Sequence, residues 1–146
     1  MNKVTIYCHK ETPDAVIPQV AYNNSSAAFD LTCTEDTVIP AMGSAVVPNG
    51  LNITIDQREK YYMQIHLRSS MGFKHEMVLH SGIVDAGYTG PFGVKVYNLN
   101  NEAYQIKKGE RYAQVTVIEK PQYELVELDD EKYELLKKNQ ERGDSG

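Results

Sequence analysis

Short apolar segments alternate with clusters of turn residues along most of this chain, and little of it follows the helical period. Turn residues gather at Asn23-Asn24-Ser25-Ser26 and at Pro48-Asn49-Gly50. The segments between such clusters that read as strands are 3–8, 27–33, 45–55, 61–67, 104–106 and 112–118. Many short strands at close spacing favour an all-β sandwich or barrel.

Residues 82–98 predict a β-hairpin that contains one isolated acid. Two apolar segments, 83–84 and 92–96, flank a turn that holds two glycines and a proline. Asp85 ends the first arm, and the two-residue period of a strand places it on the same face as Ile83. A carboxylate therefore stands where the pattern would accept another apolar residue, and we interpret Asp85 as a candidate functional residue.

The pattern changes after Pro121. Residues 122–128 are compatible with one more strand, and 129–141 predict a helix with acids first and Lys137-Lys138 later, as the helix dipole prefers. Gly143 is the expected end of that helix. Because this strand and helix have little core of their own, we expect them to dock on another copy of the chain, which favours an oligomer.

Length and charge narrow the function classes. A chain of 146 residues predicts one domain that buries about two-thirds of its unfolded surface. Cys8 and Cys33 are too few for a disulfide framework or a zinc site, which fits a reducing compartment such as the cytoplasm. The net charge of −5 argues against a nucleic-acid partner, and no segment is long and apolar enough to cross a membrane.

Two basic segments are candidates for binding an anion. Arg68 and two serines follow the predicted strand 61–67, where a serine can cap a short helix whose amides face an anion. Gln114 can hold a phosphate oxygen or a water, while Arg111 is better suited to pair with a carboxylate. Taken alone, an ordinary capped turn and a structural arginine explain these segments better.

Asp30 lies inside an apolar segment, 27–31, where a buried charge is costly without a partner. Its partner is either an arginine, the commoner case, or a water linked to a cation. The four histidines lack the spacing of a metal site, so no protein ligands for a metal are expected. The sequence also lacks the serine-hydrolase, zinc-protease and P-loop motifs.

Five segments taken together resemble, in order and spacing, the five motifs of the trimeric deoxyuridine triphosphatase (dUTPase) family. They are 27–31, 68–70, 82–90, 109–114 and 142–146. The most specific is the third, Gly-Ile-Val-Asp-Ala-Gly-Tyr-Thr-Gly. The resemblance implies an all-β, distorted jelly-roll with a short helical segment and a flexible C-terminal tail. Residues 1–128 would form the jelly-roll, and 129–146 a helix and a truncated glycine-rich tail.

The resemblance implies hydrolysis of dUTP to dUMP and pyrophosphate, which limits uracil in DNA and supplies dUMP for dTTP synthesis. Asp85 resembles the carboxylate that deprotonates the water attacking the α-phosphorus, as a general base must. Tyr88 resembles the aromatic that packs on the deoxyribose and leaves no room for a 2′-hydroxyl. The hairpin backbone would read uracil, with contacts from Gly82, Ile83, Val84 and Gly93.

The remaining motifs would hold the triphosphate, with Mg²⁺ bound mainly through the phosphates and water. The residues that resemble the phosphate contacts are Arg68, Ser69, Ser70, Gln114 and Arg142. Asp30 and Arg111 would be structural, with Asp30 at most touching a metal-bound water. The family forms a homotrimer in which three chains build each site. The location implied is the cytoplasm, or the host-cell cytoplasm if the source is viral.

The sequence departs from the family pattern at several positions. Leu79 replaces an asparagine that helps to recognise the base, so uracil recognition would rely more on the backbone. Ala28 and Phe29 replace a glycine and a tyrosine, which are mild changes. The glycine-rich tail ends before the phenylalanine that closes over uracil, which implies weakened turnover with the trimer intact unless the chain is a shortened form.

Two alternatives remain at this point. The related dCTP deaminases share the fold, but their glutamate lies three residues before an asparagine, where this chain has Lys95 before Asn98. Lysine cannot act as that carboxylate, which disfavours deamination. The other alternative is a non-catalytic, regulatory trimer. Retention of Asp85 and Tyr88 together with Arg68 and Gln114 argues against it.

Overall fold

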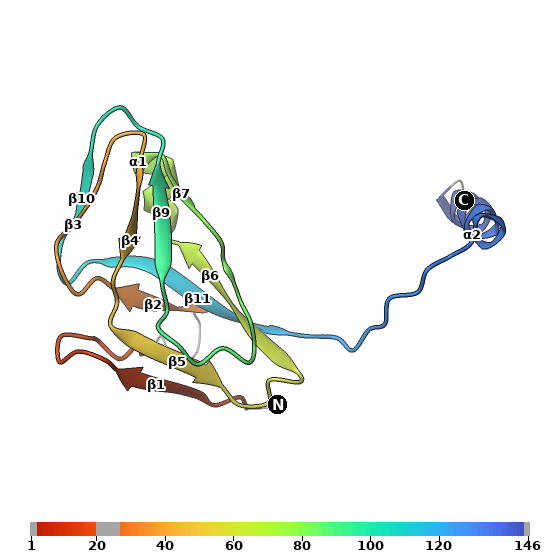
Figure 1. The fold of residues 1–146 in the computed structure, drawn as a ribbon, viewed down its shortest axis with the longest axis horizontal. Coiled ribbons are helices and arrows are strands. Elements are labelled where there is room, and N and C mark those ends of the chain that lie inside the picture. The colour runs from red at the N-terminus through yellow and green to blue at the C-terminus, as the bar shows by residue number, and fades with distance from the viewer. Residues whose placement is uncertain (1–2, 20–26, 145–146) are drawn as a thin grey trace.

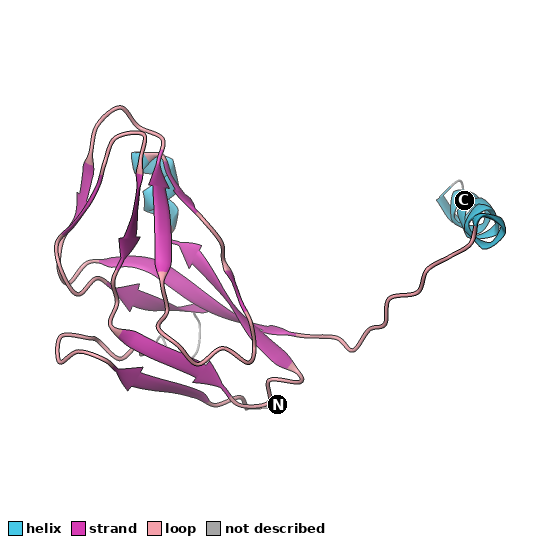
Figure 2. Ribbon diagram, viewed as in Figure 1, coloured by secondary structure: helices cyan, strands magenta, loops and turns pink. Residues whose placement is uncertain are grey.

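Strands account for most of the regular structure in the computed structural model, which describes residues 3–19 and 27–144 and, of 141–144, only the backbone (Figures 1 and 2). The strands are β1 (Ile6–Lys10), β2 (Ala28–Thr32), β3 (Thr37–Ile39), β4 (Ser44–Val47), β5 (Leu51–Ile55), β6 (Tyr61–Leu67), β7 (Met77–Leu79), β8 (Ile83–Val84), β9 (Val94–Asn98), β10 (Tyr104–Ile106) and β11 (Arg111–Glu119). The helices are α1 (Ser69–His75) and α2 (Asp130–Asp144).

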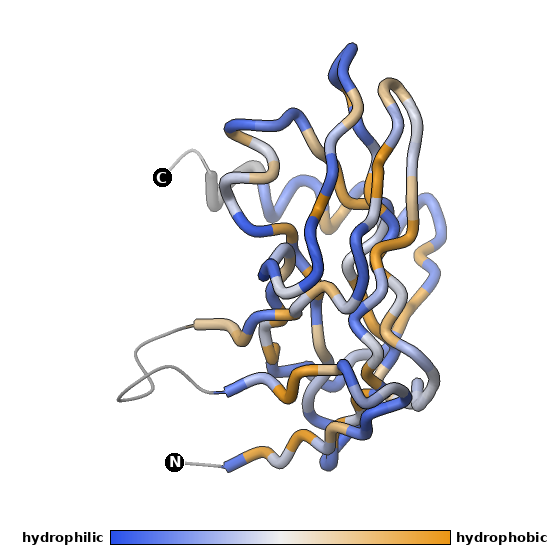
Figure 3. The backbone as a smooth tube through the Cα atoms, turned by 90° about the vertical axis from the view of Figure 1, so that its left-hand side faces the viewer, coloured by the Kyte–Doolittle hydropathy of each residue, from blue (hydrophilic) through white to orange (hydrophobic). Residues whose placement is uncertain are grey.

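The strands form a distorted jelly-roll in which every pairing is antiparallel. A four-stranded sheet has the order β2-β11-β6-β8, and a three-stranded sheet has the order β4-β9-β7. Two further pairs, β1-β5 and β10-β3, complete the body. Figure 3 shows how hydrophobic and hydrophilic residues alternate along these strands, as expected where one strand face is buried.

The core is a single cluster that takes side chains from every sheet. Leu31, Ile65 and Val115 come from the four-stranded sheet, and Val47 and Val96 from the three-stranded sheet. These residues belong to the apolar alternation of the sequence. The all-β prediction is therefore confirmed, and its physical basis is the two-residue period of the apolar positions.

β11 lies at the centre of the larger sheet and pairs with β2 and β6. A β-bulge between Arg111 and Ala113 brings both Tyr112 and Ala113 into the core. A strict two-residue alternation with Ala113, Val115 and Val117 would instead have put Tyr112 on the face of Gln114 and Thr116. An irregularity in the ladder, which depends on the paired strand, shifts the alternation.

Several predicted strand bounds need correction. The predicted strand 45–55 is two strands, β4 and β5, separated at Pro48-Asn49-Gly50, where Gly50 has φ of 68°. The first strand begins at Ile6 and continues to Lys10, instead of covering 3–8. β3 and β7 were not predicted, because three residues are too few to establish a period.

The predicted hairpin at 82–98 does not form as a paired hairpin. β8 pairs with β6, with Val84 opposite Met63, while β9 pairs with β7 and β4. The chain therefore changes partner between β7 and β8. At this point the Ile65 amide donates to the Gly82 carbonyl at 2.6 Å. The two arms separate, which leaves a slot between them.

The C-terminal arm, residues 120–144, extends away from the body and ends in α2 (Figure 1). Residues 122–128, which the sequence made compatible with a strand, form none. Their apolar side chains are exposed, including Leu125 at 91%. The predicted helix is confirmed, with Asp130 and Glu131 in its first turn, but it continues past Gly143 to Asp144. No helix in the described ranges is long and apolar enough to span a membrane.

A buried polar network holds the β4–β5 turn against the segment that precedes β9. The Asn49 side-chain amide donates to the Phe92 carbonyl at 2.7 Å and to the Tyr112 hydroxyl at 3.3 Å, and its oxygen accepts from the Leu51 amide at 3.0 Å. Tyr112 in turn donates to the Val47 carbonyl at 2.9 Å. Burial raises the pKa of Tyr112 and keeps its hydroxyl protonated as a donor.

Asn49→Ala tests this network. We expect the free energy of unfolding to fall by about 2–4 kcal/mol, because buried groups on three elements lose their partner. Urea denaturation followed by circular dichroism measures this value. Asn101→Ala, at an exposed position, is the control and should change the free energy by less than about 0.5 kcal/mol. Equal effects of the two substitutions would contradict the proposed contribution of the network.

Candidate functional site

The first candidate site is the slot between the separated arms, a pocket of about 370 Å³ that we call the hairpin pocket. Its apolar wall includes Val84 and Phe92, both buried. Asp85 and Tyr88 line it from the turn, and Gly93 lines it from the second arm. The sequence-predicted acid and aromatic are therefore brought into one cavity.

Local contacts position Tyr88 beside Asp85. The Tyr88 amide donates to the Asp85 carbonyl at 2.9 Å, and the Tyr88 hydroxyl donates to the Pro91 carbonyl at 2.6 Å. The Tyr88 ring folds over Gly90, where an added Cβ would lie 2.8 Å from the hydroxyl oxygen. A side chain at position 90 would therefore require the Tyr88 side chain to shift.

Burial follows the predicted alternation on the first arm. Val84 is buried, whereas Ile83 is 69% exposed and Asp85 is exposed as well. The face that Asp85 shares with Ile83 therefore points to solvent and not into the core. Among the described residues no ion pair includes Asp85, so its carboxylate is available to a water or a ligand.

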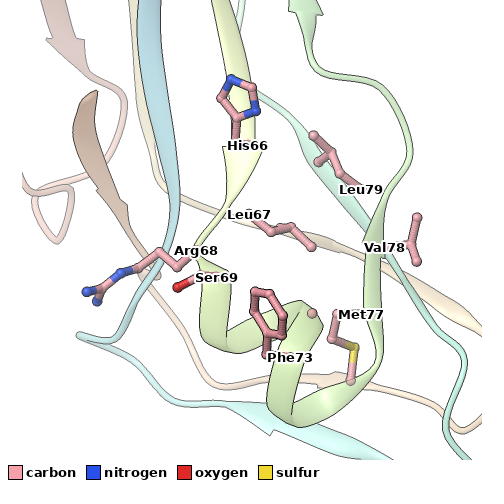
Figure 4. A pocket seen from close by; sticks show the side chains of 9 residues that line it. His66, Leu67, Arg68, Ser69, Phe73, Met77, Val78 and Leu79 are labelled. Carbon is pink, nitrogen blue, oxygen red and sulfur yellow. The ribbon is translucent and has the colours of Figure 1, made fainter. Parts of the chain in front are cut away.

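The second candidate site is an open groove of about 570 Å³ beside α1, which we call the helix groove. Leu67, Met77 and Leu79 form its apolar wall, and Arg68 and Ser69 lie at its edge. Figure 4 shows the Arg68 guanidinium pointing away from the apolar side chains. Phe73 also lines the groove and is 89% exposed.

The start of α1 differs from the prediction of a serine cap. Arg68 is the N-cap residue, with extended backbone, and it makes no side-chain cap hydrogen bond. Ser69 is the first helical residue and Ser70 follows it, exposed. The chain leaves β6 in extended conformation at Arg68, and the helix begins at Ser69, one residue too early for Ser69 to be its N-cap.

Asp30 lies between two arginines. Its carboxylate is 3.4 Å from Arg111 Nη1 and 3.9 Å from Arg68 Nε. Gln114 is opposite Asp30 in the β11–β2 ladder. These side chains are between about a third and two-thirds exposed, so the pairs stabilise the fold little. They hold the Arg68 guanidinium near Asp30. An arginine is the partner that the sequence led us to expect for Asp30.

Within one chain, the candidate base and the phosphate candidates lie in different places, and Ser70 and Gln114 line neither cavity. Asp85 and Tyr88 line the hairpin pocket, whereas Arg68 and Ser69 line the helix groove, and the two cavities have no lining residue in common. Arg142 belongs to α2, and its side chain lies outside the part of the chain that the structure describes. The acid and the phosphate candidates are not brought into one cavity.

The residues that line these cavities and that sequence analysis did not select include His80 and Lys95 in the hairpin pocket, and Phe73 in the helix groove. The sequence held a signal for Lys95, because the apolar alternation of Val94 and Val96 places it on the other face. His80 and Phe73 carried no such signal, since their positions depend on how the chain leaves β7 and α1.

Among the described residues, neither the cysteines nor the side chains that could bind a metal ion form a further candidate site. Both cysteines are unpaired, and burial is the main cause that raises the pKa of the Cys8 and Cys33 thiols, so neither is activated as a thiolate. Within residues 3–19 and 27–144 no three histidine, cysteine or acidic side chains gather to hold a metal ion.

Comparisons with known proteins agree on one family. The dUTPase family model matches residues 14–146. The chain is 39% identical over 132 residues to the deoxyuridine 5'-triphosphate nucleotidohydrolase of Wolinella succinogenes, covering 88% of this chain and 86% of that protein. It is 35% identical over 121 residues to the Arabidopsis thaliana protein of the same name, covering 83% of this chain and 71% of that protein.

Solved structures show the same fold. The dUTPase of Staphylococcus bacteriophage 80alpha superposes with a TM-score of 0.75 at 23% identity, covering 86% of this chain and 97% of that one. A mutant dUTPase of phage phi11, described with a structural Mg(II) ion, superposes with a TM-score of 0.76 at 20% identity and the same coverages. At these identities the likeness establishes the fold.

Gly82→Ala tests the partner change that opens the hairpin pocket. An added Cβ would clash with the Ile65 carbonyl oxygen, so we expect β8 to separate from β6 and the free energy of unfolding to fall by about 1–3 kcal/mol. Urea denaturation gives that value, and amide exchange of Ile65 reports the local hydrogen bond.

Gly87→Ala is the matched control. A Cβ added at Gly87 meets nothing within 4 Å. The exchange of the Ile65 amide and the free energy of unfolding of Gly87→Ala should therefore stay close to those of the unsubstituted protein. Unchanged Ile65 exchange in Gly82→Ala would show that the close approach does not set the pairing.

Proposed function

This chain belongs to the dUTPase family and hydrolyses dUTP to dUMP and pyrophosphate, and on that premise we propose that the hairpin pocket binds the deoxyuridine while Asp85 activates the attacking water. The observation that carries the proposal is that Asp85 and Tyr88 line one pocket. This pocket lies between two backbone segments that pair with different strands and not with each other. The reaction removes dUTP, a source of uracil in DNA, and provides dUMP for dTTP synthesis.

The base enters the slot edge first. Uracil presents one N–H and two carbonyl oxygens, which backbone carbonyls and amides complement. The contacts come from Gly82, Ile83 and Val84 on one arm and from Gly93 on the other. In the family pattern an asparagine that helps to recognise the base stands where this chain has Leu79. Leu79 lines the helix groove instead of the hairpin pocket, so recognition of uracil relies on the backbone of the two arms.

Tyr88 packs against the deoxyribose. Its hydroxyl is engaged by the Pro91 carbonyl and its ring is fixed over Gly90, so the aromatic face is held in one place. A ribose would need room for a 2′-hydroxyl on the side where the ring lies. The rigid ring therefore selects deoxyribonucleotides through exclusion, without a hydrogen bond to the sugar.

Asp85 acts as the general base. Its carboxylate takes a proton from a water as the water oxygen forms a bond to the α-phosphorus, and the bond from that phosphorus to the bridging oxygen breaks and releases pyrophosphate. A carboxylate without an ion-pair partner among the described residues retains its capacity to accept the proton. Negative charge develops on the leaving pyrophosphate, so cations on that side lower the barrier.

The triphosphate is held by Arg68, Ser69, Ser70 and Gln114, with Arg142 from the C-terminal arm. Asp30 and Arg111 position the Arg68 guanidinium. Mg²⁺ would be held mainly by the triphosphate and by water, and when bound it would neutralise part of the phosphate charge. Asp30, already paired with arginines, would at most contact a water on that ion.

We place each complete site between chains of a homotrimer. The hairpin pocket and the helix groove are separate in one chain, and the C-terminal arm exposes apolar residues that a neighbouring copy would cover. One chain then provides the hairpin, a second the phosphate residues, and a third the arm. In this arrangement residues 1–128 form the jelly-roll and 129–146 a separate helix and tail.

Asp85→Asn tests the assigned base. We expect kcat for dUTP to fall by about 10²–10⁴-fold, because the amide cannot accept the proton, with thermal stability unchanged. Pyrophosphate release from dUTP, dCTP, dTTP and UTP measures both rate and selectivity, and only dUTP should be a good substrate. Glu102→Gln, on an exposed loop, is the charge-matched control and should keep full activity. A normal rate in Asp85→Asn would refute the assignment.

Mixing two inactive variants tests the shared site. Asp85→Asn and Arg68→Ala each disable every site in their own trimer, but co-refolded chains form sites that take the hairpin from one variant and the arginine from the other. Random assembly restores about a quarter of the sites. Light scattering should give about 50 kDa, three times 16.5 kDa. A monomer, or no recovered activity, would contradict the shared site.

A further inference from the structure

The hairpin pocket is lined by one lysine, Lys95, to which the mechanism above assigns no role. Lys95 lies on β9 and lines the same pocket as Asp85 and Tyr88. No ion pair among the described residues includes it. A lysine in a ligand pocket without a carboxylate partner can donate to a ligand, and the following inference rests on the proposed function of that pocket.

Backbone pairing places Lys95 at the closed end of the slot. The ladder between β7 and β9 ends where the His80 amide donates to the Lys95 carbonyl at 3.0 Å. Beyond that bond the first arm pairs with β6 and the slot opens. His80 and Lys95 therefore mark the point at which the two arms part, whereas Asp85 and Tyr88 belong to the turn region.

Tyr97 holds both side chains of the closed end. Lys95 Nζ lies 5.6 Å from the centroid of the Tyr97 ring, within the range of a cation–π contact. The Tyr97 hydroxyl and His80 Nδ1 form a hydrogen bond of 3.0 Å. Tyr97 does not itself line the pocket. It is a positioning residue that restricts where the ammonium group can lie.

The direction of the base follows from the position of the sugar. With the deoxyribose against Tyr88, the base is attached through N1 near the turn. C4 lies opposite N1 in a pyrimidine ring, so the substituent at C4 points toward the closed end. In uracil this substituent is a carbonyl oxygen, an acceptor, and in cytosine it is an amino group, a donor.

We propose that Lys95, held over Tyr97, is a specificity-determining residue that donates a hydrogen bond to O4 of uracil. An ammonium group has three donors and no acceptor, so it cannot pair with the amino group of cytosine. Cytosine would place two donors against each other and leave the charged one without its partner. Lys95 thus adds a side-chain criterion to the reading of the base by the backbone.

Lys95→Met tests the proposal, because methionine keeps the length of the side chain and removes the donor. We expect kcat/KM for dUTP, divided by kcat/KM for dCTP, to fall by about 10- to 100-fold, as for a lost hydrogen bond to a charged group. Lys95→Arg should keep most of the selectivity. Lys95→Glu, which introduces an acceptor, should raise dCTP hydrolysis relative to dUTP.

Tyr97 variants separate positioning from direct contact. Tyr97→Phe keeps the ring under the ammonium group and should retain most of the selectivity, whereas Tyr97→Leu should raise KM for dUTP and lower the selectivity with little change in kcat. Lys60→Met, in a turn outside both cavities, controls for the loss of a positive charge and should leave the ratio unchanged.

An unchanged ratio in Lys95→Met would overturn the proposal, and so would an equal fall for both substrates, which indicates a phosphate contact. If Lys95→Met does not fold in a thermal melt, Lys95→Arg and Lys95→Glu provide the same comparison. Failure of the unsubstituted protein to prefer dUTP would instead refute the proposed function. The two failures are therefore distinguishable.

Discussion

The change of strand partner at Gly82 is the constraint on which the rest of the site depends. Up to His80 the chain pairs with β9, and from Ile83 it pairs with β6. A continuous hairpin would use the backbone groups of both arms in its own ladder, because buried amides and carbonyls must be paired. The partner change separates the arms and creates a cavity with backbone on two sides.

The buried polar network fixes the position of one side of this cavity. Asn49 and Tyr112 connect the β4–β5 turn to the carbonyl of Phe92, which lines the hairpin pocket. Such a network is costly when only partly satisfied, so its members hold one geometry. The ion pairs of Asp30 differ, since they are partly exposed and contribute orientation for Arg68 more than stability.

The distribution of exposed apolar surface supports the proposed assembly into a homotrimer. Phe73 beside the helix groove and Leu125 on the C-terminal arm are almost fully exposed, and the arm makes little contact with the body (Figure 1). Exposed apolar groups of this size are typical of surfaces that another chain covers. Phe73 lines the same groove as Arg68 and Ser69, which are proposed to bind phosphate, so on the proposed arrangement assembly and catalysis would share this surface.

The sequence by itself determined the fold class, the family resemblance and the identity of the candidate acid, because alternation, turn residues and motif order are local properties. Strands β2, β6 and β11 and the helix α2 follow from such patterns. Only the tertiary structure decided which strands pair, that Arg68 instead of Ser69 occupies the N-cap position of α1, and that a bulge buries Tyr112. It alone placed Lys95 in the same pocket as Asp85, since a shared pocket depends on hydrogen bonds between distant segments.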